Sequence, residues 1–107
     1  MAAVFVEDRI VVPPGRLAAV SALLGGRYLA AASARGLALV GSWITPPAEL
    51  PGRDTELVLL WSLPDLAAFW RMRAAGSADA GLAALWGEVD ALAVRRARRF
   101  LAPVALA

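Results

Sequence analysis

The order of strand-like and helix-like segments constrains this chain more than any other feature. Residues 4–12 read VFVEDRIVV, a run rich in β-branched residues, and Pro13-Pro14-Gly15 close it as a turn. Apolar residues then recur at helical spacing up to Gly36, which takes the place of a helix C-cap. Because glycine weakens a helix interior, we expect Gly25-Gly26 to bend this helix or to split it in two.

A pair of strands follows this helix. Residues 38–45 (ALVGSWIT) and 55–63 (TELVLLWSL) are rich in β-formers and are bounded by glycine and proline. The proline-rich loop 46–54 separates them, and two consecutive strands joined in this way are predicted to form an antiparallel hairpin.

The second helical region is predicted to begin directly after the hairpin. Ser62, Pro64 and Asp65 stand in the order of a capping hydroxyl, a first-turn proline and a first-turn carboxylate. Ser77 is placed to cap a further segment with strong helical periodicity, and residues 94–101 are predicted as a fourth strand, although their arginines also fit one more helical turn. Three large apolar side chains are expected to face inward from the first part: Leu66, Phe69 and Trp70.

The resulting order, β-α-β-β-α-β, is typical of a ferredoxin-like α+β domain. We expect one domain, 1–107, with a four-stranded antiparallel sheet and its helices on one face. The opposite face is left bare for a second sheet or a ligand.

The apolar content favours burial against a second subunit. Apolar residues make up 60% of the chain and the mean hydropathy is +0.62, yet the longest charge-free stretch, 36–48, is short and contains two prolines. A bilayer span needs about 20 apolar residues. Glu7, Asp8 and Arg9 interrupt the apolar run that a secretory signal needs. We therefore expect a cytoplasmic homodimer with no membrane partner.

The titratable residues are unusual in kind. All eleven basic residues are arginine, and the chain has no His and no Cys, which excludes a Ser-His-Asp triad and leaves no confident metal site. No cofactor is predicted. The arginines of segment 95–99 alternate along a strand, so they fit a solvated edge or, through residues such as Arg98, an anion site. Because no binding motif accompanies them, we expect no nucleic-acid partner.

Several short motifs resemble NIPSNAP-like proteins. The segments 7–9 (EDR) and 14–17 (PGRL) resemble the E-x-R…PG(K/R)L opening of that family. Residues 39–43 (LVGSW) resemble its second strand, and 56–61 (ELVLLW) resemble its E-V-V-H-L-W third strand. The likeness extends over nearly the whole chain in the order of the elements.

The resemblance implies a dimeric α/β barrel, in which two ferredoxin-like protomers pack sheet against sheet around a shared pocket. That superfamily includes cofactor-free monooxygenases, polyketide cyclases and haem proteins, so it implies a pocket more than a reaction. The chain departs from the family at Leu59, where a histidine is common, and at Asp8, where an apolar residue is expected. The missing histidine removes the most obvious acid/base or haem-ligating group.

The first strand separates its charged residues by face. Phe5, Glu7 and Arg9 share one face, predicted to point into the barrel, whereas Asp8 lies on the more apolar face toward the helices. A charged pair beside apolar walls is a candidate catalytic site, with Glu7 or Asp8 as base and Arg9 stabilising negative charge. The same residues also fit structural ion pairs, and a buried Asp8 needs a bulge or an arginine partner.

The third strand supplies the candidate pocket wall. The family register places Leu57, Leu59 and Trp61 in the barrel pocket, where Trp43 can join them. Aromatic walls of this kind suit a planar or polycyclic ligand, but both tryptophans also fit a dimer core. Tyr28, the only phenol, lies on the buried stripe of the first helix and is assigned to packing.

Two functions fit these observations. The first is a homodimer that binds a small apolar or aromatic metabolite of bacterial secondary metabolism; any catalysis is cofactor-free cyclisation, isomerisation or oxygenation. The second is a non-catalytic binding or assembly module whose apolar sheet face serves only dimerisation. A cavity lined by Glu7, Arg9 and Trp61 favours the first function, and a solidly packed sheet face favours the second.

Overall fold

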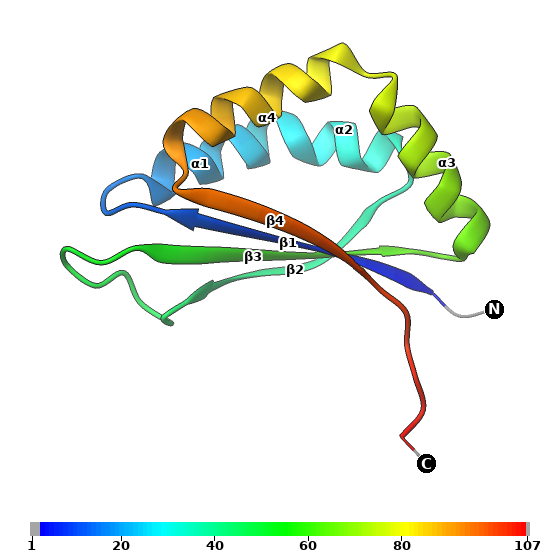
Figure 1. The fold of residues 1–107 in the computed structure, drawn as a ribbon, viewed down its shortest axis with the longest axis horizontal. Coiled ribbons are helices and arrows are strands. Elements are labelled where there is room, and N and C mark those ends of the chain that lie inside the picture. Colours follow the sequence, from blue (N-terminus) through cyan, green and yellow to red (C-terminus); the bar gives the residue numbers. More distant parts are fainter. Residues whose placement is uncertain (1–2, 107) are drawn as a thin grey trace.

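The computed structural model describes residues 3–106 as a layer of helices on one face of a four-stranded antiparallel sheet (Figure 1). The strands lie side by side in the order β2-β3-β1-β4, which confirms the predicted ferredoxin-like α+β fold. The elements have these bounds: β1 Val4–Val12, α1 Leu17–Leu23, η1 Leu24–Tyr28, α2 Leu29–Ala34, β2 Ala38–Thr45, β3 Thr55–Leu63, α3 Leu66–Ser77, α4 Ala80–Leu92 and β4 Arg95–Leu101.

The two central strands, β1 and β3, carry the core. Every second residue of β3 is buried, as expected for a strand that is covered on one face only. Directly opposed residues of an antiparallel pair point to the same side of the sheet. Val6 therefore meets Trp61, and Ile10 meets Leu57, beneath the helices.

The first helical region runs without a break from α1 through η1 to α2. The Gly25-Gly26 pair lies in η1, a π-helical turn, so the expected irregularity is a local widening of the helix. Gly36 ends the region with a φ of +88°, as its predicted C-cap role requires. The segment Leu17–Ala34 meets the length and composition of a membrane span. It also carries Arg27, which is paired with Glu88.

The second helical region starts later than the sequence suggested. The N-cap of α3 is Asp65, whose carboxylate accepts a hydrogen bond from the Ala68 amide at 2.8 Å, and not Ser62. Asp79, and not Ser77, caps α4. Of the three apolar residues that we expected to face inward from α3, only Phe69 is buried. Leu66 and Trp70 are exposed, so the prediction was wrong for these two.

The other face of the sheet has no helix beneath it (Figure 1). The chain after β4 leaves the sheet on this uncovered side, and its apolar residues Val104 and Leu106 are exposed. We call this side the open face and the opposite side the helix face.

Candidate functional site

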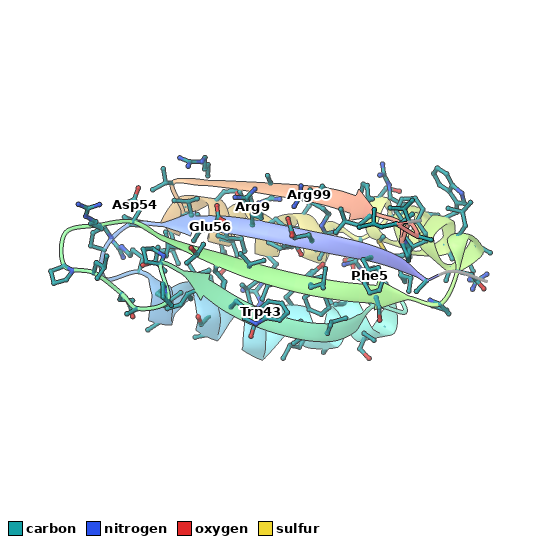
Figure 2. All side chains as sticks on the ribbon, turned by 90° about the horizontal axis from the view of Figure 1, so that it is seen from below. Phe5, Arg9, Trp43, Asp54, Glu56 and Arg99 are labelled. Carbon is teal, nitrogen blue, oxygen red and sulfur yellow. The ribbon has the colours of Figure 1, made fainter. Side chains whose placement is uncertain are left out.

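The predicted site residues divide between the two faces of the sheet. Phe5, Glu7 and Arg9 point to the open face, as expected from the alternation along β1, and Trp43 lies there too (Figure 2). Trp43 faces Val58 across the β2–β3 pair and is 52% exposed. Of these residues, Arg9 lines a pocket of about 180 Å³ together with Val11, Glu56 and the start of β4.

The prediction that the β3 row shares this face is wrong. Leu57, Leu59 and Trp61 oppose Ile10, Asp8 and Val6 of β1, so they lie on the helix face with these partners. Alignment with the third strand of NIPSNAP-like proteins placed this row on the open face, and the sequence did not contradict it because β3 is apolar on both faces. Cross-strand pairing with β1, whose helix face is the more apolar one, decides the orientation.

The open face holds two exposed ion pairs. Arg9 donates to both carboxylate oxygens of Glu56, with a shortest distance of 2.9 Å, and Arg99 Nε donates to Glu7 Oε1 at 2.7 Å. The hydrogen bond to Glu7, and then the charge of that carboxylate, raise the pKa of Arg99 above its ordinary value. Glu7 and Arg9 therefore each have a partner already, which matches the structural alternative for this pair.

Asp8 is the centre of a buried polar cluster on the helix face. Its side chain is 5% exposed. Arg98 donates two hydrogen bonds to it, from Nε at 2.7 Å and from a terminal nitrogen at 3.0 Å. The indole nitrogen of Trp61 donates to the same carboxylate at 3.0 Å. The arginine partner expected for Asp8 is thus present, and both carboxylate oxygens are engaged.

Electrostatics hold Arg98 in its charged form. Burial alone lowers the pKa of an arginine, but the hydrogen bonds and negative charge of Asp8, together with contact to Tyr28, outweigh it. The net result is a pKa above the ordinary arginine value. Arg98 is therefore charged where it contacts Asp8.

Tyr28 joins this cluster from the first helix. Its hydroxyl oxygen accepts hydrogen bonds from Arg98 at 2.5 Å and from Arg35 at 3.0 Å. Its ring meets Trp61 edge-on at a centroid distance of 5.3 Å and Trp86 at 4.8 Å. Tyr28 is a core residue as predicted, but its polar role was missed: Arg98 lies 70 residues away in the sequence, and Arg35, only 7 residues away, was the local signal for it.

A cavity of about 140 Å³ lies beside this cluster, between the first helical region and strands β2 and β3. The π-helical turn forms one wall and β3 the other. The aromatic part of that wall is Tyr28 and Trp61. The remaining lining is mainly aliphatic, with two serine hydroxyls: Ser21, Leu24, Gly25, Leu29, Leu39, Ser42, Leu57 and Leu59.

The size of this cavity limits what it can hold. An apolar protein cavity of about 150 Å³ accepts a benzene ring. The cavity therefore fits one ring or a short branched chain, and it is too small to enclose the polycyclic body that the aromatic walls suggested. Leu57, Leu59 and Trp61 line this cavity within one protomer, and not the predicted pocket between two sheets.

The arginines of β4 alternate as the strand pattern predicted. Arg98 faces inward, whereas Arg99 pairs with Glu7 on the open face. Arg96 lies over the Trp86 ring at 4.5 Å and pairs with Asp90. Among residues 3–106, no three His, Cys, Asp or Glu side chains gather in the manner of a metal site.

Comparisons with known proteins agree on the fold. No protein-family model and no curated protein matches the sequence. Solved structures do match: a NIPSNAP family protein from Agrobacterium tumefaciens has a TM-score of 0.73 at 18% identity, over 99% of this chain and 90% of that one. The chain therefore has the ferredoxin-like fold of NIPSNAP proteins, which confirms the resemblance at the level of structure.

Two further structures share the fold and have informative descriptions. SnoaB from Streptomyces nogalater, a cofactor-independent oxygenase, has a TM-score of 0.61 at 18% identity, over 99% of this chain and 97% of that one. A dimeric ferredoxin-like protein from an uncultured marine organism has a TM-score of 0.65 at 10% identity, over 99% and 91%. Identities this low establish the fold and leave the activity open.

Proposed function

We propose that this protein is a cytoplasmic homodimer in which each protomer binds a small apolar or aromatic metabolite in the cavity between its helices and β3. The observation that carries this proposal is the cavity itself, with its mainly aliphatic lining and the rings of Tyr28 and Trp61. Sites of this composition bind ligands by excluding water and by matching their shape.

The polar cluster behind the cavity supports a fixed binding wall. Tyr28 is held by two guanidinium groups, and Trp61 is held by Asp8, so neither ring is free to collapse into the space. Rings held by hydrogen bonds at their far edge keep a cavity open at low entropic cost to binding. Asp8 thus acts on a bound ligand through Trp61, as a positioning residue.

The chemistry we propose is cofactor-free conversion of the bound metabolite, by cyclisation, isomerisation or oxygenation. A dry cavity can favour one outcome of a reactive substrate by holding it in one conformation. The shared fold with a cofactor-independent oxygenase is consistent with this kind of chemistry. Glu7 and Arg9 lie across the sheet from the cavity, so any catalytic role of theirs belongs to a dimer interface.

The open face supports the homodimer. Its middle holds half-buried apolar side chains, Val58 and Leu60, beside the exposed Trp43. A sheet face with this content is typically covered by another layer. The exposed tail residues Val104 and Leu106 extend on the same side and can pack against a second copy (Figure 1).

Binding to the cavity is tested by titrating the protein with toluene, phenol and indole, with tryptophan fluorescence and calorimetry as readouts. We expect saturable heats of binding for at least one compound and, with toluene, a change in the tryptophan emission of the protein, because Trp61 lines the cavity. Indole emits like tryptophan, so its binding is measured by calorimetry alone. Substitution Ser42→Phe places a ring in the cavity mouth, so it should abolish binding while the protein stays folded. The control Ser33→Phe changes an exposed residue of α2 outside the cavity lining and should leave binding intact.

Binding that is the same in Ser42→Phe as in the unchanged protein would place the ligand elsewhere. No binding of any probe by a folded dimer would favour the assembly module, which the apolar content of the open face also fits.

The dimer is tested by sedimentation. Leu60→Glu places a charge at the centre of the open face and should shift the protein to the monomer. Leu66→Glu changes a leucine that is 56% exposed on α3 and should leave the mass unchanged. If the wild-type protein sediments as a monomer even at high concentration, the proposed homodimer is excluded.

A further inference from the structure

A second pocket, on the far side of Tyr28, is built around guanidinium groups. Its volume is about 310 Å³, and it lies between the end of the first helical region, α3, the start of α4 and β4. Arg35, Arg73 and Arg98 all line it, and no carboxylate does. The other lining residues are Met72, Gly76, Ser77, Leu82 and Phe100.

The positive charges of this pocket exceed the negative charge near them. Within residues 3–106, Arg98 pairs with Asp8, whereas neither Arg35 nor Arg73 takes part in an ion pair. Arg35 and Arg98 both donate to the single oxygen of Tyr28, so the two guanidinium groups lie close to each other. Asp8 balances the charge of Arg98, so the charges of Arg35 and Arg73 are the ones that a further anion would offset.

Arg35 also carries an unsatisfied donor. Its Nε atom is buried and has no hydrogen-bond partner among the described residues. A buried N–H without an acceptor is costly, and native proteins rarely leave one unpaired. Of the two terminal nitrogens, Nη2 donates to Tyr28, whereas Nη1 lies beside Gly76 in the pocket lining, where it can donate to an oxyanion.

The surrounding residues hold the arginines in position. A β-carbon added at Gly76 would lie 2.7 Å from a terminal nitrogen of Arg35, so the absence of a side chain there lets the guanidinium approach α3. Arg73 lies over the Phe100 ring at 5.1 Å and over the Phe69 ring at 5.9 Å. Stacking of this kind orders an exposed arginine without neutralising its charge.

We propose that this pocket binds a small oxyanion, a carboxylate or a phosphate ester that carries an apolar body. Arg35 and Arg73 contact the anion, and Arg98, whose charge Asp8 balances, holds the Tyr28 hydroxyl at the back of the pocket. The side chains of Met72, Leu82 and Phe100 receive the apolar part. This site goes beyond the proposed function, because the neutral ligand of the cavity lies on the other side of Tyr28.

Calorimetry at low salt tests the site with benzoate, phenyl phosphate and inorganic phosphate. Benzyl alcohol serves as the neutral comparison. We expect the aromatic anions to bind, benzyl alcohol not to compete with them, and affinity to fall as salt rises. Comparing the affinities of benzoate and phenyl phosphate shows whether the site prefers a carboxylate or a phosphate ester. Comparing phenyl phosphate with inorganic phosphate gives the contribution of the apolar body. The side-chain Nε–H signals of Arg35 and Arg73 should shift in nitrogen-edited NMR spectra.

Two variants and one control connect this binding to the pocket. Arg73→Gln removes an exposed charge and should weaken binding about tenfold, the usual worth of one charge-assisted contact. Gly76→Ala removes no charge but displaces the Arg35 guanidinium, so it should also weaken binding. Arg53→Gln removes an equal charge from the exposed loop before β3 and should change nothing.

Three outcomes would overturn the site. The first is no binding of any of the three anions at millimolar concentration. The second is equal weakening by Arg53→Gln and Arg73→Gln, which indicates attraction by net charge alone. The third is loss of anion binding in Ser42→Phe, which would place the anion in the cavity. Failure of this site leaves the proposed function standing, because that function is tested with neutral probes.

Discussion

The two faces of β1 use the same chemistry with different consequences. Asp8 points to the helix face and pairs with Arg98, whereas Glu7 and Arg9 on either side of it pair on the open face with Arg99 and Glu56. The buried pair has side chains that are 5% and 22% exposed. The arginines of the open pairs are about half exposed or more, at 48% and 60%.

This difference decides what each pair contributes. An ion pair in water gains little, because solvent screens the charges and two long side chains lose freedom. A buried pair depends on its partner, because either charge left alone keeps its desolvation penalty. The buried cluster on the helix face therefore fixes the cavity wall. The ion pairs on the open face contribute more to stability only when a second layer of protein removes them from water.

Breaking the buried pair should have the largest effect. Asp8→Asn keeps an acceptor for Trp61 but leaves Arg98 without a counter-charge. We expect a loss of about 3 kcal/mol in the free energy of unfolding, near the low end for a buried pair because Arg98 is partly exposed. Chemical denaturation followed by circular dichroism measures it.

The double variant Asp8→Asn/Arg98→Met is the control for this prediction. Removing the unpaired charge should recover part of the lost stability, since no desolvated charge is then left without a counter-charge. A double variant no more stable than Asp8→Asn would show that packing, and not charge, accounts for the loss.

Removing the second donor to Asp8 should have an intermediate effect. Trp61→Phe deletes the indole N–H that donates to the carboxylate at 3.0 Å, and it leaves a small void in the wall of the cavity. We expect a loss of about 2 kcal/mol in unfolding free energy, the range for a hydrogen bond to a charged group. Trp70→Phe is the matched control: that side chain is 61% exposed, so its change should stay within about 0.5 kcal/mol.

The sequence determines the elements well because their signals are local. The β-branched run of β1 and the prolines and glycines that bound β2 and β3 each act within a few residues. The predicted caps of α3 and α4 were wrong. Ser62 and Asp65 both carry a suitable oxygen, and only the backbone conformation selects Asp65. Neighbouring candidates of equal chemistry are not separable by pattern alone.

The site was predicted less well because it depends on contacts between distant segments. β3 carries leucine or valine on both of its faces, so alternation does not say which row faces the helices. The pairing of Trp61 with Val6 decides it. The β4 partner of Tyr28 has no local signal, whereas Arg35 follows Tyr28 at i+7, a spacing that places both on one helix face. Asp8 was the exception, because a carboxylate on an apolar face requires a cationic partner wherever one is available.

The smallest effect, and the sharpest test of the comparison, belongs to the open face. Glu56→Gln removes the partner of Arg9, and in the isolated protomer this should cost no more than about 0.5 kcal/mol in unfolding free energy. If a second copy covers this face, Arg9 loses water as well as its partner, so the same substitution should weaken the dimer. Denaturation of the variant at low and high protein concentration, with sedimentation at both, separates the two contributions. A cost that stays small at every concentration would mean that these charges remain in water and that the open face is not the dimer interface.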